Sequence, residues 1–387
     1  MSTYARLPVS FARGAGALLW DSTGREYLDA VSGIAVCGLG HAHPAVTEAL
    51  CAQAGTLVHT SNLYEIPLQA ELAAQLVERS GMEAAFFCNS GAEANEAAIK
   101  LARLYGHRRG VAQPAVVVAE GSFHGRTLAT LTATGNRRVQ AGFEPLVRGF
   151  LRVPYNDLDG LRAIARNRSD AVAVLLEPIQ GESGVRVPDP GYLAGVRALC
   201  DEFGWLMMLD EVQTGIARTG AWFAFQHEAV RPDVITLAKG LGNGVPIGAC
   251  LARGPAAALF TPGTHASTFG GNPLACSAAL AVLRTIAEQD LVTRAAQLGE
   301  RIREGLARGL PPAAGVREIR GRGLMIGIEL ERPCTDLVRR ALERGLLINV
   351  TAERVIRLLP PLILSDAQAE RIVNEVCGLV QAFYAAA

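Results

Sequence analysis

The sequence predicts an α/β protein in which a large, mostly parallel sheet domain is followed by a smaller α+β domain. From residue 46 to about 285, short and almost wholly apolar runs alternate with segments of helical periodicity, which is typical of a parallel sheet with helices on both faces. After residue 285 the pattern changes: Leu298, Ile302 and Leu306 form one helical stripe, and GLMIGIELE and VIRLLP resemble strands. We therefore expect an N-terminal segment (1–45), a large domain (46–285) and a small domain (286–387).

The individual elements follow from the same patterns. Strands of the large domain are expected at AAFFC (84–88), AVVVAE (115–120), AVAVLLE (171–177), WLMMLD (205–210), VITLA (234–238) and GACLA (248–252). Helices are expected between them, for example in AEANEAAIKLARLYG and PGYLAGVRALCDEFG, and again at the C-terminal end of the chain. Before the large domain, ALLWDSTGREYLDA predicts a hairpin with a turn at DSTG.

The overall composition excludes several classes of protein. The formal net charge is +0 and half the residues are hydrophobic, so no strongly basic surface for nucleic acid is expected. The longest apolar runs are much shorter than a membrane-spanning helix, and the N-terminus lacks the apolar stretch of a secretory signal. The eight cysteines contain no CxxC pair, and the histidines form no metal-binding motif. We expect a soluble cytoplasmic protein without a metal site.

Lysine is rare in this chain, and one lysine has an unusual position. Of the 37 basic residues only Lys100 and Lys239 are lysines, so 35 are arginine. Lys239 directly follows an apolar strand, where open α/β sheets place their ligands. A lysine amine can lose its proton and attack a carbonyl, which a guanidinium cannot do. The alternative is a surface lysine retained by chance, and for Lys100 we favour that alternative because Glu96 lies one helical turn earlier.

Two further strand ends carry residues that suit a phosphorylated ring cofactor. Asp210 ends the strand WLMMLD, where a carboxylate could keep a pyridine nitrogen protonated, as pyridoxal phosphate requires. In FFCNSGAEANEAAIKLAR, a strand is followed by Ser90 and Gly91 and then by a helix, and free N–H groups at a helix start favour a phosphate. Taken singly, Asp210 could be a turn residue and Ser90 an ordinary helix cap. Together with Lys239 they indicate a pyridoxal phosphate site.

Six motifs extend this interpretation to a family. SGAEANEAAIKLAR, SFHGRT, EPIQGESGV, LDEVQTGIARTG, LAKGLGNGVPIGA and STFGGNPLAC together resemble the class III (ω-amino) aminotransferases, which are pyridoxal phosphate enzymes of fold type I. The similarity extends over almost the whole chain and is strongest to the members that act on N2-acetyl-L-ornithine. One departure is Asn243, which interrupts a run of glycines after Lys239. Asparagine tolerates left-handed backbone, so we expect no loss of function.

The resemblance implies a role for each matching residue. Lys239 would bond to the cofactor and then carry the proton between substrate and cofactor, and Asp210 would hold the ring nitrogen. Gln213 would contact the ring hydroxyl, and Val212 and Phe123 would enclose the ring. Thr268 would come from a partner subunit, so the resemblance implies a homodimer with shared active sites. Residues 1–45 are expected to pack with the small domain and with the dimer partner. The implied cofactor-binding residues are Ser90, Gly91, Ala92, Phe123, Asp210, Glu211, Val212, Gln213, Lys239 and Thr268.

The implied substrate residues are Arg126, Glu182, Ser267 and Arg357. Arg126, assisted by Ser267, would bind a substrate carboxylate bidentately. Glu182 would mask the charge of Arg357 while the ω-amine is bound and move aside for 2-oxoglutarate. An ordinary salt bridge between domains is the alternative for that pair, since an unpaired buried arginine would be costly.

The reaction implied by the resemblance is transfer of the distal amino group of N2-acetyl-L-ornithine to 2-oxoglutarate, in arginine biosynthesis. Succinylornithine, N-succinyl-diaminopimelate, ornithine and 4-aminobutyrate are alternative donors for the same site. A dinucleotide-dependent oxidoreductase is an alternative of another class, but GLGNGVPIG follows a late strand and lacks the spacing of the dinucleotide fingerprint.

Overall fold

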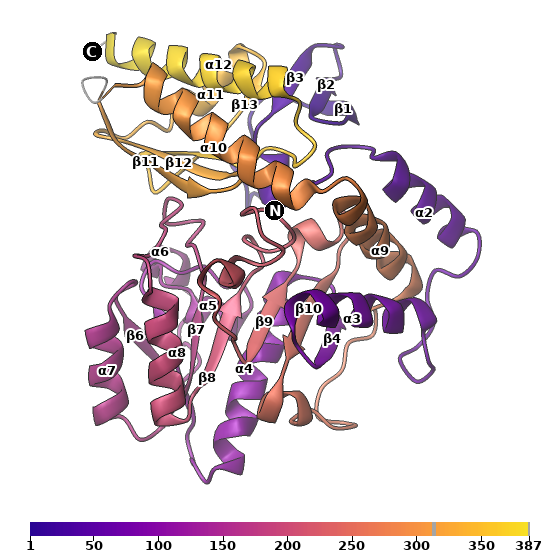
Figure 1. Ribbon diagram of the computed structural model, residues 1–387, viewed down its shortest axis with the longest axis vertical. Helices are drawn as coiled ribbons and strands as arrows, with labels where there is room; N and C mark the ends of the chain where they lie inside the picture. The colour runs from indigo at the N-terminus through magenta and orange to yellow at the C-terminus, as the bar shows by residue number, and fades with distance from the viewer. Residues whose placement is uncertain (312–314, 386–387) are drawn as a thin grey trace.

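The computed structural model describes residues 1–311 and 315–385. Figure 1 shows a large sheet with helices on both faces and, at one end of it, two smaller sheets together with the C-terminal helix. The large sheet has seven strands in the order β4-β10-β9-β8-β7-β5-β6. Neighbouring pairs from β9 to β6 are parallel, whereas β10 is antiparallel to both β4 and β9. The predicted α/β class and the mostly parallel sheet are therefore confirmed.

The strands of the large sheet lie where the apolar runs predict them. They are β4 (Ala84–Cys88), β5 (Ala115–Ala119), β6 (Phe150–Val153), β7 (Ala171–Leu176), β8 (Leu206–Asp210), β9 (Val234–Leu237) and β10 (Gly248–Ala252). Six of them match a predicted run to within one residue at each end. The seventh, β6, was not predicted because it is a half-exposed edge strand whose apolar residues are interrupted by Arg152.

Helices bury both faces of this sheet. Helix α4 (Gly91–Arg108) packs with Val116, Val118 and Met208 in one apolar cluster. The residues that alternate with these in the strands, such as Val117 and Met207, face the other side and join a cluster that includes α8 (Tyr192–Phe203). Helix α7 (Leu158–Asn167) lies beside α8. Burial on both faces explains why these strands are apolar at nearly every position.

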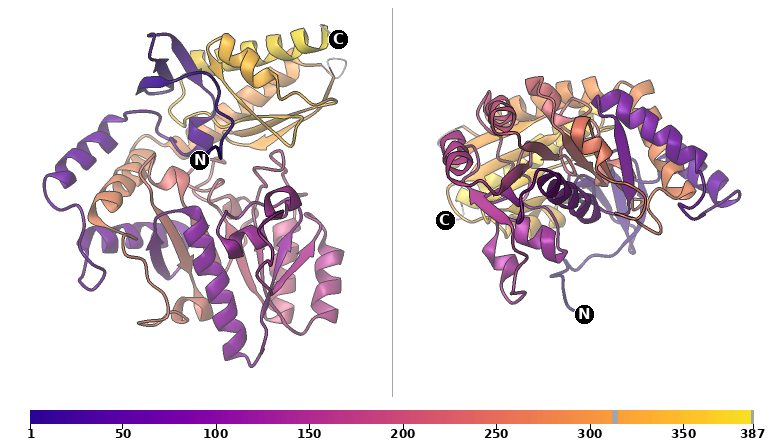
Figure 2. Two further views of the ribbon diagram at one scale, coloured as in Figure 1. Left: turned by 180° about the vertical axis from the view of Figure 1, so that it is seen from behind. Right: turned by 90° about the horizontal axis from the view of Figure 1, so that it is seen from below.

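The C-terminal part of the chain forms a second sheet covered by helices. Its strands are β11 (Val316–Arg322), β12 (Met325–Leu330), β15 (Val355–Leu358) and β14 (Asn349–Thr351), all antiparallel and in that order. Helices α10 (Leu291–Gly309), α11 (Leu337–Glu343) and α12 (Asp366–Ala385) belong to the same part of the chain, and α10 and α12 lie side by side in Figures 1 and 2. The helical stripe and the strands predicted after residue 285 are confirmed.

The N-terminal hairpin joins this C-terminal part. Strands β2 (Leu18–Asp21) and β3 (Glu26–Asp29) pair as predicted, and β1 (Phe11–Ala15), which was not predicted, pairs with β2. The short strand β13 (Leu346–Leu347) adds to β3 in parallel. The two ends of the chain are thus linked by backbone hydrogen bonds, although the proposed boundaries at residues 45 and 285 stay predictions.

The remaining elements connect these parts. They are α1 (Ser32–Ala35), α2 (Pro44–Ala54), α3 (Pro67–Ser80), α5 (Leu128–Ala133), α6 (Arg137–Gln140), α9 (Pro273–Glu288) and the 3-10 turns η1 (Ala224–Glu228), η2 (Lys239–Leu241) and η3 (Gly254–Ala258). Among the described residues, no helix is both long and apolar enough to cross a membrane.

Candidate active site

A cavity of about 400 Å³ opens where β4, β7, β8 and β9 end. The residues that follow these four strands come together there because the strands run in the same direction, and such a strand edge is the usual ligand site of an open α/β sheet. The predicted residues that line the cavity are Ser90, Gly91, Ala92, Phe123, Arg126, Asp210, Val212, Gln213 and Lys239. The structure therefore brings most of the predicted site into one cavity.

Lys239 begins the turn η2 directly after β9 and has a positive φ of 44°. A non-glycine residue in this left-handed region is uncommon and often marks a functional site. Burial lowers the pKa of its amine below the usual value, and the positive charge of Arg357 lowers it further, while the Glu182 carboxylate opposes the shift. A lysine in these surroundings loses its proton more readily than a surface lysine, as a nucleophile must.

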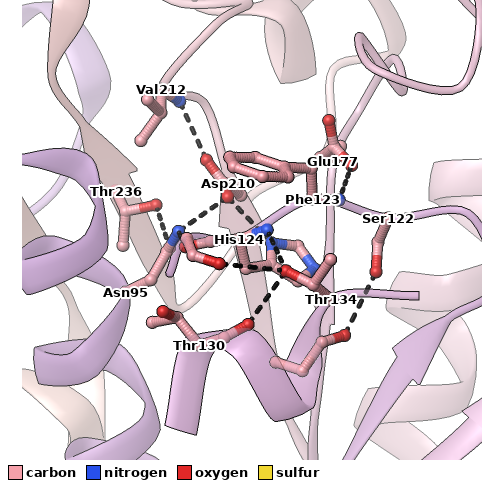
Figure 3. A network of polar contacts seen from close by, with 12 residues as sticks. Asn95, Ser122, Phe123, His124, Thr130, Thr134, Glu177, Asp210, Val212 and Thr236 are labelled. Carbon is pink, nitrogen blue, oxygen red and sulfur yellow. Dashed lines mark hydrogen bonds and ion pairs between the residues drawn. The ribbon is translucent and has the colours of Figure 1, made fainter. Parts of the chain in front are cut away.

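Asp210 is held by a network of buried hydrogen bonds (Figure 3). Its Oδ2 accepts from Asn95 Nδ2 at 2.7 Å and lies 2.8 Å from Nδ1 of His124, while Oδ1 accepts from the backbone N–H of Val212 at 3.0 Å. Thr236 donates in turn to Asn95 Oδ1 at 2.7 Å. The residue is 4% exposed, and these bonds fix the orientation of its carboxylate toward the cavity.

The start of α4 forms the part of the cavity suited to an anion. Ser90 caps the helix by accepting from the backbone N–H of Glu93 at 3.2 Å, and the first-turn N–H groups of Gly91 and Ala92 have no intrahelical partner. A Cβ on Gly91 would lie 2.8 Å from Cγ1 of Val212, so this position requires glycine. Free N–H groups, the positive end of the helix dipole and a close backbone approach suit a phosphate.

Phe123 and Arg126 line another side of the cavity. The backbone N–H of Phe123 donates to Oε1 of Glu177 at 2.8 Å, which fixes the loop that carries the ring. The guanidinium of Arg126 lies 5.6 Å from the centre of the Phe123 ring. Within residues 1–311 and 315–385, no carboxylate lies within 4.0 Å of Arg126. Arg126 is therefore an exposed cation available to an anionic ligand.

Arg357 and Glu182 form an ion pair next to the cavity. Nη1 of Arg357 lies 2.6 Å from Oε1 of Glu182, and the same nitrogen donates to Oε1 of Gln213 at 3.3 Å. Gln213 lines the cavity, so it connects the pair to the interior of the site. Burial raises the pKa of the Glu182 carboxyl, but the neighbouring charges and hydrogen bonds, those of Arg357 above all, outweigh burial and lower the pKa overall.

Besides Glu182 and Arg357, which lie next to it, three more predicted residues do not line the main cavity. The Glu211 carboxylate accepts from the backbone N–H groups of Ala224 and Phe225, and burial raises its pKa to about 7. Thr268 is exposed and lines a separate surface pocket. Ser267 lies in that pocket too, but its Oγ accepts from Asn89, which lines the main cavity, at 3.3 Å.

Lys100 was expected to be a surface lysine that pairs with Glu96, and the expected partner is wrong. Lys100 does not pair with Glu96 in the described structure; its Nζ lies 2.8 Å from Nδ1 of His265 and donates to the carbonyl of Thr264 at 3.3 Å. Glu96 accepts instead from the hydroxyl of Thr127. Lys100 is still a surface residue outside the cavity.

Four residues of the site were not predicted: Asn95, His124, Glu177 and Asn349. Glu177 carried a signal, because it is an acid at the end of an apolar strand, as Asp210 is. Burial raises its pKa to about 7, partly opposed by His124. The sequence gives no comparable signal for Asn95, because its partners Asp210 and Thr236 are distant in the chain.

The donor set of this cavity fits pyridoxal phosphate. The start of α4 suits the phosphate, Asp210 has a fixed orientation and suits a protonated ring nitrogen, and Lys239 has a lowered pKa that suits a bond to an aldehyde. The fold and the site together define a pyridoxal phosphate-dependent enzyme.

Comparison with known proteins identifies the family. Residues 2–379 match the model of the aminotransferase class-III family, and the chain belongs to that family. It is 60% identical to an acetylornithine aminotransferase of Nitrosomonas europaea, over 99% of this chain and 98% of the relative. The protein is therefore an aminotransferase, and its cofactor is pyridoxal phosphate.

Solved structures support the same assignment. The ornithine aminotransferase of Toxoplasma gondii superposes with a TM-score of 0.97 at 34% identity, covering 100% of this chain and 93% of that one. The N-acetylornithine aminotransferase of Stenotrophomonas maltophilia has a TM-score of 0.85 at 38% identity, covering 100% and 99%. The expected fold type is thereby confirmed, and the oxidoreductase alternative is wrong.

Proposed function

We propose that this aminotransferase transfers the distal amino group of N2-acetyl-L-ornithine to 2-oxoglutarate. The products are N-acetyl-L-glutamate 5-semialdehyde and L-glutamate, as in arginine biosynthesis, and the enzyme acts in the cytoplasm. The observation that carries the proposal is the position of two arginines. In the part of the chain that the structure describes, Arg126 at the cavity has no carboxylate partner, whereas Arg357 is paired with Glu182. The site would therefore bind one carboxylate in the first half-reaction and a different one in the second.

The chain's own residues would hold the cofactor as follows. The N–H groups of Gly91 and Ala92 would bind the phosphate, and Phe123 and Val212 would enclose the ring. Asp210 would accept a hydrogen bond from the ring nitrogen, and Gln213 would contact the ring hydroxyl. When bound, pyridoxal phosphate supplies an electron sink that stabilises negative charge on the substrate carbon.

Lys239 would move the proton in the reaction. The lowered pKa favours the neutral form of its amine, which would then be able to act as a base. The neutral amine removes the proton from the substrate carbon that bears the transferred nitrogen. The resulting ammonium would then give up that proton again, so that Lys239 would be base and acid in turn.

Arg126 and Arg357 would divide the two substrates between them. Arg126, assisted by Ser267, would bind the α-carboxylate of N-acetylornithine, which leaves the distal amine directed into the cavity. During this half-reaction Glu182 neutralises Arg357. When 2-oxoglutarate binds, Glu182 would give way to a carboxylate of that acceptor, and Arg357 would bind it in place of Glu182.

We further propose that the enzyme is a homodimer whose partner subunit supplies Thr268. The proposal is supported by the exposed position of Thr268 outside its own cavity and by exposed apolar residues nearby, since Leu63 is 86% and Phe269 59% exposed. Residues 1–45 would also pack against the partner, and residues 46–285 would form the cofactor-binding domain. Light scattering should give twice the mass of one chain.

The substrate assignment is tested by a donor panel. The purified enzyme, 2-oxoglutarate and one amine at a time are incubated, and glutamate is measured. N-Acetylornithine should give the highest kcat/KM. Ornithine is the second candidate, because the superposition with the Toxoplasma enzyme covers the whole chain. A clear preference for ornithine would replace the proposed donor but leave the aminotransferase assignment intact.

A further inference from the structure

We propose that Asn349 is a positioning residue that prepares Arg357 to bind the acceptor's carboxylate. This inference rests on the proposed function, in which Glu182 and the acceptor alternate on Arg357. Asn349 lies outside every motif that indicates the family, and it does not line the main cavity.

The guanidinium of Arg357 has two edges, and the structure uses them differently. On the side edge, Nε and Nη2 both donate to Oδ1 of Asn349, at 3.1 and 2.7 Å. On the end of the group, Nη1 donates to Glu182 at 2.6 Å. A neutral amide therefore holds the edge that points away from Glu182, and the Nη1/Nη2 end remains suited to a bidentate carboxylate.

The backbone explains why Asn349 is so well placed. Asn349 in β14 and Arg357 in β15 are directly opposed partners in an antiparallel pair. Side chains of opposed residues lie on the same face of a sheet and are close enough to bond. Arg357 is 1% exposed, so a guanidinium without this partner would leave a buried N–H group unsatisfied or would turn away.

The neutrality of Asn349 matters for the exchange of substrates. An asparagine oxygen orients the guanidinium without cancelling its charge. Among the described residues the charge is paired with Glu182 only, so it becomes available when Glu182 moves. An aspartate in the same place would keep Arg357 oriented but would neutralise it permanently. The acceptor's carboxylate would then meet a pair of carboxylates around one cation.

This difference separates a charge-specific role from a merely structural one. If Asn349 only held the fold together, the isosteric Asn349→Asp variant should bind the acceptor as well as the wild type does, and Asn349→Ala should have the lowest affinity for it. If Asn349 orients Arg357 without neutralising its charge, the order of affinities is reversed, and Asn349→Asp should bind the acceptor most weakly. The matched control is Asn167→Asp, which adds the same charge at an exposed helix end.

The experiment measures binding of glutarate, an unreactive five-carbon dicarboxylate, to the cofactor-loaded enzyme by titration calorimetry. We expect Asn349→Asp to lower the affinity for glutarate about tenfold or more and Asn349→Ala to lower it less. Asn167→Asp should bind glutarate as the wild type does. In parallel, absorbance follows each half-reaction alone. In Asn349→Asp, the rate of the half-reaction with 2-oxoglutarate should fall by about tenfold more than the rate of the half-reaction with the amine donor.

Either of two results with the variants would overturn the inference: unchanged glutarate affinity in Asn349→Asp, or equal losses of rate in the donor and acceptor half-reactions. Absence of glutarate binding by the wild type would also overturn it. A wild type that binds glutarate but does not use N-acetylornithine would instead refute the proposed donor and leave the role of Asn349 standing. Circular dichroism of each variant shows that differences in binding do not come from unfolding.

Discussion

Arg357 and Glu182 lie 2.6 Å apart although 175 residues separate them in the chain. Arg357 comes from β15 of the C-terminal sheet, and Glu182 comes from the loop after β7 of the large sheet. The arginine is almost completely buried, while the glutamate is half-buried. Because a buried cation without a partner is costly, a ligand that displaces Glu182 from Arg357 must bring a carboxylate of its own.

The first prediction concerns this pair. Glu182→Gln should leave Arg357 without its neutralising partner, so that glutamate competes as a donor for the amine site. The kcat/KM for glutamate relative to N-acetylornithine should rise about tenfold or more. Rates of the donor half-reaction with each amine measure this ratio. An unchanged ratio would mean that the pair is an ordinary salt bridge.

The second prediction concerns Lys239. Both Lys239→Ala and Lys239→Arg should lose turnover almost completely, because neither side chain can act as a nucleophile and then carry a proton near neutral pH. The folded state should persist, as circular dichroism can verify. Lys100→Ala, which removes the other lysine of the chain, should keep wild-type activity. Substantial turnover by either Lys239 variant would refute the proposed mechanism.

The third prediction concerns Arg126. Arg126→Ala should raise the KM for N-acetylornithine by about 10-fold to 100-fold, because a charge-assisted contact to the substrate carboxylate is lost. Steady-state kinetics with varied donor give this value. Arg138→Ala removes an exposed arginine that pairs with Glu353 and should leave the KM unchanged. If Arg126→Ala also left the KM unchanged, another residue must bind the substrate carboxylate.

The fourth prediction concerns pH and stability. His41 Nε2 lies 2.7 Å from Oδ2 of the buried Asp29, and hydrogen bonds to Asp29 and Cys37 raise the pKa of the imidazole to about 9. Since the pKa in the folded state is above the unfolded value, the His41–Asp29 pair contributes fully to the free energy of unfolding below about pH 6.5. This contribution is lost as the pH rises toward 9.

The measurement is the free energy of unfolding between pH 6.5 and 9.5 for the wild type and His41→Gln. The wild type should lose about 2 kcal/mol more than the variant across this range. Parallel curves for the two proteins would show that the ion pair does not contribute to stability.

The fold could be predicted in large part because buried strands of a parallel sheet must be apolar on both faces. β7 and β8 illustrate this, since every residue in them is buried. β6 and β1 could not be predicted because they are edge strands with exposed residues, whose pairing depends on neighbours remote in sequence. The parallel pairing of β13 with β3 is likewise a contact between the two ends of the chain.

The site could be predicted where a residue's position along the chain already indicates its role. Lys239 and Asp210 directly follow or end apolar strands, and Gly91 begins a helix. Asn95 and His124, which fix Asp210, lie within a helix and a loop where a polar residue has many ordinary explanations. Only the three-dimensional arrangement shows that both bond to the same carboxylate oxygen.

The most direct test of the proposed reaction is a visible absorption spectrum of the purified, cofactor-loaded enzyme during stepwise addition of its two substrates. The proposal predicts that the band of the bound cofactor bleaches when N-acetylornithine is added alone and returns when 2-oxoglutarate follows. The same sequence with Lys239→Ala should give neither change. A wild-type band that is indifferent to N-acetylornithine, but bleaches with another ω-amine, would contradict the proposed substrate.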